Sequence, residues 1–108
     1  MAYDEELADR VRDSLSRWEG LTERRMFGGI AFMLSGNMAA GVLRDALMVR
    51  VGPDGYEDAL AAGAAPMSMG HREMRGFVSV GRDELADPAT LDAWVARGAD
   101  HAAALPPK

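Results

Sequence analysis

Three arginines are the residues of this chain best suited to bind another molecule. Two of them are adjacent and form the start of a short motif. Guanidinium groups bind carboxylates and phosphates through paired hydrogen bonds, although arginines at the start of a strand can also be simply solvated. The motif ends in two adjacent glycines, which predict a bulge or a close approach of another backbone or a ligand. The candidate residues for a family motif or an interaction are Arg24, Arg25, Met26, Phe27, Gly28, Gly29 and Arg50.

The sequence offers little for catalysis. It has no cysteine, and its two histidines, His71 and His101, are expected to face solvent. Its one lysine is Lys108, which rules out a Walker-type phosphate loop, and Gly28-Gly29 leads into an apolar strand rather than a dinucleotide-binding turn. The carboxylates lie at helix starts or on polar faces, where solvation and helix dipoles explain them. We therefore expect no enzymatic activity, no catalytic residue, no cofactor and no metal.

Length and charge restrict the class of protein further. A chain of 108 residues fits one domain over 1–108. The formal net charge of −5 makes direct nucleic-acid binding a poor expectation, because phosphate contacts require a basic face. No apolar run approaches the ~20 residues that span a bilayer, and the acidic N-terminus differs from a secretory signal. We expect a cytoplasmic protein with no membrane partner.

The periodicity of apolar residues predicts an α+β fold with antiparallel strands. The Asp87-Pro88 pair predicts the start of the last helix, with aspartate as cap and proline in the first position. In the third strand, Leu47 and Val49 share one face while Met48 and Arg50 share the other. The order is helix 4–17, strands 25–34, 38–43 and 46–51, helix 53–62, strands 67–69 and 74–80, and a helix from 87.

The chain is rich in methionine. It contains eight, and most of them fall on the expected strands. We expect these flexible side chains to fill the core, and the alternative is an adaptable apolar surface for another protein.

Several motifs together resemble the N-terminal domain of the TfoX/Sxy family. They are the stretch 24–29, Gly36 in a turn, the segment 47–52 and the segment 76–80, in that order. The resemblance implies a fold similar to the type III secretion chaperones, with helix, three strands, helix, two strands and helix, and it suggests a homodimer. Named members regulate natural competence with a cyclic-AMP-responsive activator and are not known as enzymes. Those regulators carry a second, C-terminal helical domain, whereas this sequence is expected to be a single TfoX N-terminal-like domain.

Two functions stay open at this point. The first is a non-enzymatic regulatory module that binds a protein partner, such as a transcription regulator. The alternative is a domain that binds a small anionic ligand, or a minor enzyme, built around Arg24, Arg25 and Arg50.

Overall fold

The structure is a computed structural model that describes residues 3–26, 28–69 and 72–107. Its centre is an antiparallel sheet of six strands in the order β1-β2-β3-β4-β6-β5, accompanied by three α-helices, so the predicted α+β class is confirmed. A short 3₁₀ helix precedes the last α-helix. In chain order the elements are α1 (Glu5–Leu15), β1 (Leu21–Met26), β2 (Gly29–Leu34), β3 (Asn37–Leu43), β4 (Ala46–Arg50), α2 (Gly52–Ala61), β5 (Ala65–Met69), β6 (Arg72–Gly81), η1 (Arg82–Leu85) and α3 (Pro88–Ala103).

The prediction of one strand over 25–34 is wrong, because the glycine pair divides that segment into a hairpin. Gly28 has a φ of +78°, a backbone conformation that glycine adopts without a steric penalty, and it turns β1 into β2. Gly29 then passes so close to β3 that a Cβ at this position would lie 2.5 Å from the carbonyl oxygen of Val42. The predicted close approach of another backbone is confirmed, and four strands rather than three precede α2.

The other turns and helix starts agree with the local sequence. Ser35 and Gly36, with φ of 51° and 86°, form the two-residue connection between β2 and β3. The carboxylate of Asp4 accepts a hydrogen bond from the backbone N–H of Leu7 and caps α1. Asp87 caps α3 in the same way through the N–H of Ala89. The first helix ends at Leu15, two residues earlier than predicted.

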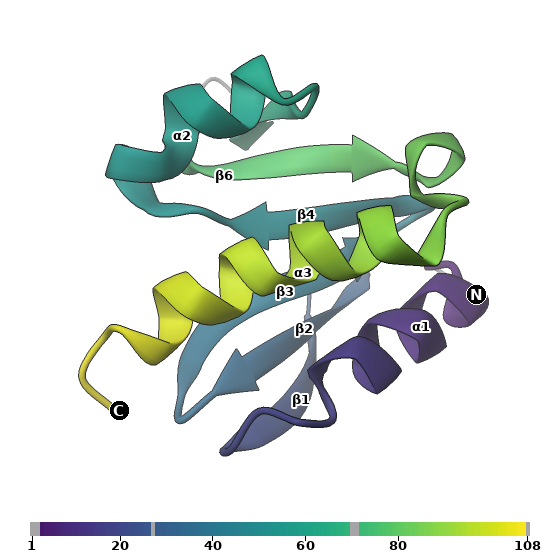
Figure 1. The fold of residues 1–108 in the computed structure, drawn as a ribbon, viewed down its shortest axis with the longest axis vertical. Coiled ribbons are helices and arrows are strands. Elements are labelled where there is room, and N and C mark those ends of the chain that lie inside the picture. Colours follow the sequence, from purple (N-terminus) through teal and green to yellow (C-terminus); the bar gives the residue numbers. More distant parts are fainter. Residues whose placement is uncertain (1–2, 27, 70–71, 108) are drawn as a thin grey trace.

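The helices lie on one face of the sheet. Figure 1 shows α3 across β3 and β4, α1 beside it, and α2 at the β6 end of the sheet. Their apolar side chains form one core cluster with those from the same face of the strands, including Phe32, Val49 and Val78. None of the helices in the part of the chain that the structure describes is long and apolar enough to cross a membrane.

Two features bring α1 and α3 against the rest of the fold. Gly98 of α3 lies directly on β3, where a side chain would overlap the carbonyl oxygen of Ala39. The strand bulges at that point, since Phe32 pairs with Ala40 but Met33 pairs with Met38. The 3₁₀ helix was not predicted from the sequence, and its Leu85 is completely buried. The backbone carbonyl of Leu85 accepts a hydrogen bond of 2.6 Å from Arg10 of α1.

Acid should weaken the link between α1 and β1. Arg12 donates from Nε and Nη2 to the two carboxylate oxygens of Glu23, and this pairing holds the pKa of Glu23 below its ordinary value of 4.5 against the opposing effect of burial. A group whose pKa is lower in the folded state contributes stability above its unfolded pKa, and that contribution is lost as the pH falls through the folded value. We expect the urea midpoint to fall below about pH 4.5, and to fall less in Glu23→Gln.

The control for this experiment is Glu84→Gln, which changes an exposed glutamate in η1. It should retain the wild-type pH dependence. Identical pH dependence of Glu23→Gln and the wild type would contradict the assigned role of the Arg12–Glu23 pair.

Candidate functional site

The face of the sheet opposite the helices is a candidate for a binding surface. Side chains alternate between the two faces along each strand, and residues paired across strands share a face. The row that contains Ala31, Gly41 and Met48 therefore points away from Ile30, Val42 and Leu47, which are buried under the helices. We call this surface the open face; its described side chains include Thr22, Arg24, Ala31, Met33, Met38, Leu43, Ala46, Met48, Arg50, Ala65, Phe77 and Ser79, with Gly41 among them.

The open face is apolar at its centre. Met33, Met38, Met48 and Phe77 are all half-buried, and none of the described methionines belongs to the buried core. The expectation that the methionines fill the core is therefore wrong for these residues. The three helices pack on the opposite face of the sheet and form the core there, so the methionines of the open face have no helix to pack against.

Gly41 allows the methionine side chains to lie flat on the sheet. A Cβ at this position would lie 2.8 Å from Cε of Met48 and 3.2 Å from Cε of Met38. The two thioethers thus cover the backbone of β3 from either side. Unbranched and polarisable, they form a smooth surface that can adjust to the shape of a partner.

The three candidate arginines do not converge on one point. Arg24 pairs with Ala31 and lies on the open face, whereas Arg25 pairs with Ile30 and points to the helix side. Arg50 lies on the open face, with its guanidinium carbon 5.9 Å from the centre of the Phe77 ring. Three strand spacings and two residues along the strand separate Arg24 from Arg50, which is about 14 Å across the sheet and about 7 Å along it. A single anion pocket built from all three is not formed.

The rest of the candidate motif forms the hairpin turn between β1 and β2. Gly28 and Gly29 make the turn described above, and Met26 closes β1 opposite Gly29. Phe27 lies outside the described residues, as does His71.

The positive charges of the open face are not neutralised within the described structure. Arg12 pairs with Asp9 and Glu23, and Arg82 pairs with Asp4 and Glu6 at the start of α1. No ion pair joins Arg24 or Arg50 to any carboxylate among the described residues, and no acidic side chain lies among the open-face residues named above. The open face is basic and apolar in a chain whose formal net charge is −5.

Both free edges of the sheet are poorly suited to strand pairing with another chain. The β1 edge carries the charged residues Glu23, Arg24 and Arg25, and the β5 edge carries Pro66, which has no backbone N–H. Charged side chains and proline at edge strands are common protection against such pairing. The open face is therefore a better candidate for association than the edges.

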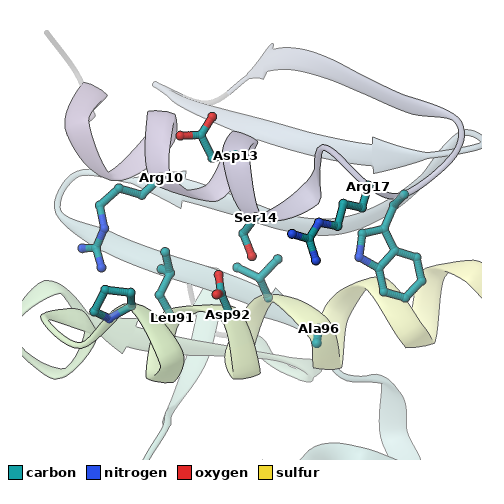
Figure 2. A pocket seen from close by; sticks show the side chains of 10 residues that line it. Arg10, Asp13, Ser14, Arg17, Leu91, Asp92 and Ala96 are labelled. Atoms are coloured by element: carbon teal, nitrogen blue, oxygen red, sulfur yellow. The ribbon is translucent and has the colours of Figure 1, made fainter.

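A groove of about 510 Å³ lies between α1 and α3. Figure 2 shows Ser14 of α1 and Asp92 of α3 pointing into this groove, with Arg10 and Arg17 on either side of them. Arg10 is already bound to the carbonyl of Leu85. The lining combines two arginines with two aspartates, Asp13 and Asp92, so its charge selects neither an anion nor a cation.

The described residues contain no group of three or more histidine, cysteine, aspartate or glutamate side chains that could hold a metal ion. His101 of α3 is half-buried and packs on Gly52, where a Cβ would meet the imidazole ring. Its position is explained by this packing at the start of α2, and the expectation that it faces solvent is only partly met.

Comparison with known protein families gives a match over most of the chain. The family model described as the TfoX N-terminal domain matches residues 13–102, which include the hairpin motif and every strand of the open face. No curated protein and no solved structure gave a significant match.

Proposed function

Because the chain belongs to the TfoX N-terminal domain family, we propose that it is a non-enzymatic regulatory module that works by binding another protein. The observation that carries this proposal is the open face. Soluble monomers rarely leave a large contiguous apolar surface uncovered, and such surfaces mark sites of interaction. Here three methionines and a phenylalanine form it, beside Arg24 and Arg50, which form no ion pair with any described carboxylate.

The partner that we propose is a transcription regulator. The resemblance to TfoX/Sxy regulators suggests a cyclic-AMP-responsive activator of the competence type, with the chain acting in the cytoplasm. The chaperone-like character of the fold and the homodimer suggested by the same resemblance stay predictions. Light scattering of the purified protein tests the homodimer.

Binding to such an activator should depend on the open face. We expect Met48→Glu to weaken the affinity for a purified cyclic-AMP-responsive activator by about tenfold or more, because it places a charge at the apolar centre of the surface. Biolayer interferometry with immobilised protein, in the presence of cyclic AMP, measures the affinity.

The matched control is Arg17→Glu, an exposed change beside the groove between α1 and α3 and off the open face. It should bind as the wild type does. Absence of binding to the activator, or equal weakening by both variants, would contradict the proposed function.

A further inference from the structure

The open face has a charge opposite to that of the molecule as a whole. None of the described open-face side chains is acidic, and they include Arg24 and Arg50. The apolar centre consists of Met33 on β2, Met38 on β3 and Met48 on β4. Arg24 lies on β1, next to β2, and Arg50 lies on β4, two residues after Met48. Charge and polarity together restrict what can cover this surface.

A second copy of the chain fits the surface poorly. Two open faces packed together would bring four guanidinium groups into one interface, and the open face supplies no carboxylate to pair with them. Like charges juxtaposed at an interface cost several kcal/mol. Single-stranded nucleic acid fits poorly as well, because its bases stack on several aromatic rings and the described open face has one, Phe77.

We propose that the open face binds an amphipathic helix of a protein partner, one whose apolar stripe is flanked by carboxylates. This inference rests on the proposed function and names the kind of segment that the partner presents. Methionine-rich surfaces commonly receive the apolar side of a helix, since the flexible thioethers adjust to its side chains.

The dimensions of the surface agree with this occupant when the helix runs along the strands. The seven residues of β3 span about 24 Å, which is the length of a helix of about 16 residues. Arg24 and Arg50 are about 16 Å apart by the spacings given above, and a helix with its side chains is about 10 Å in diameter. A helix on the methionines can therefore have a guanidinium group near each of its flanks, where carboxylates form charge-assisted hydrogen bonds.

Two synthetic peptides test the inference directly. Both are helical, about 16 residues long and identical in their leucine stripe, but one has glutamates beside the stripe and the other has lysines. Fluorescence anisotropy should show the glutamate peptide binding about tenfold or more tightly than the lysine peptide at about 0.1 M salt. At about 1 M salt the difference should shrink, because the Debye length falls from about 10 Å to about 3 Å.

Variants of the protein assign the binding to the open face. The double variant Arg24→Glu/Arg50→Glu should reverse the preference and bind the lysine peptide more tightly. Met48→Glu should weaken binding of both peptides, and Arg17→Glu should leave both affinities unchanged. Circular dichroism and the urea midpoint of each variant establish that it is folded before its affinity is compared.

Three results would overturn the inference: equal binding of the two peptides, no binding of either peptide at about 1 mM, or a homodimer that Met48→Glu dissociates into monomers. The peptide experiment does not involve the activator. A glutamate peptide that binds, together with an activator that does not, would therefore disprove the proposed regulatory partner and leave the surface assignment in place.

Discussion

Replacing Phe32 by alanine should lower the free energy of unfolding by about 3–5 kcal/mol, whereas the same replacement of Phe77 should lower it by about 1 kcal/mol or less. The two phenylalanines lie on strands of one sheet and face opposite sides. Phe32 is completely buried under the helices, where its removal leaves a cavity. Phe77 is half-buried on the open face, where solvent fills the space that it leaves.

Urea unfolding of the two variants measures this difference. The two variants can be compared directly, because both replace a strand phenylalanine by alanine and remove the same side-chain volume. Similar losses of stability for Phe32→Ala and Phe77→Ala would mean that both faces of the sheet are covered, and would contradict the assignment of the open face.

Gly98→Ala should destabilise the protein by about 3 kcal/mol, against the usual trend in helices. In a helix interior alanine is more favourable than glycine by about 0.8–1.0 kcal/mol. At Gly98, however, the added Cβ would overlap the carbonyl oxygen of Ala39 and lie 3.2 Å from Cγ1 of Val49. Backbone atoms cannot rotate away as a side chain can, so α3 would have to move off β3.

The matched control is Gly55→Ala in α2, where the nearest atom to the added Cβ is Cβ of Val51 at 3.4 Å. This is ordinary contact, and the variant should be neutral or more stable than the wild type. A gain in stability from Gly98→Ala equal to that from Gly55→Ala would show that α3 does not lie directly on the bulge of β3.

Most elements of the fold could be predicted because their signals are local. The cap at Asp87, the turn at Ser35-Gly36 and the alternation of Leu47, Met48 and Val49 are each determined by neighbouring residues. The first hairpin was missed because a glycine pair before an apolar run is compatible with both a bulge and a turn. The segment 21–26 also has no alternating apolar pattern, as is common for a strand at the edge of a sheet.

The candidate site was predictable only in part. Sequence parity correctly placed Met48 and Arg50 opposite Leu47. It could not show which face the helices cover, because that depends on how α1, α2 and α3 pack on strands distant in sequence. For the same reason Arg24 and Arg25, adjacent in the motif, could be expected to act together, although the structure places them on opposite faces.

Methyl NMR is the most direct test of the claim that the open face is an uncovered binding surface. Isotope labels on methionine and isoleucine methyl groups report on Met33, Met38 and Met48 and, on the helix side, on Ile30, the chain's one isoleucine. In the free protein, a soluble paramagnetic agent should broaden the three methionine signals much more than that of Ile30, and the glutamate-flanked peptide should then protect them. Methionine methyls as protected as Ile30 in the free monomer, or unchanged by the peptide, would contradict the account.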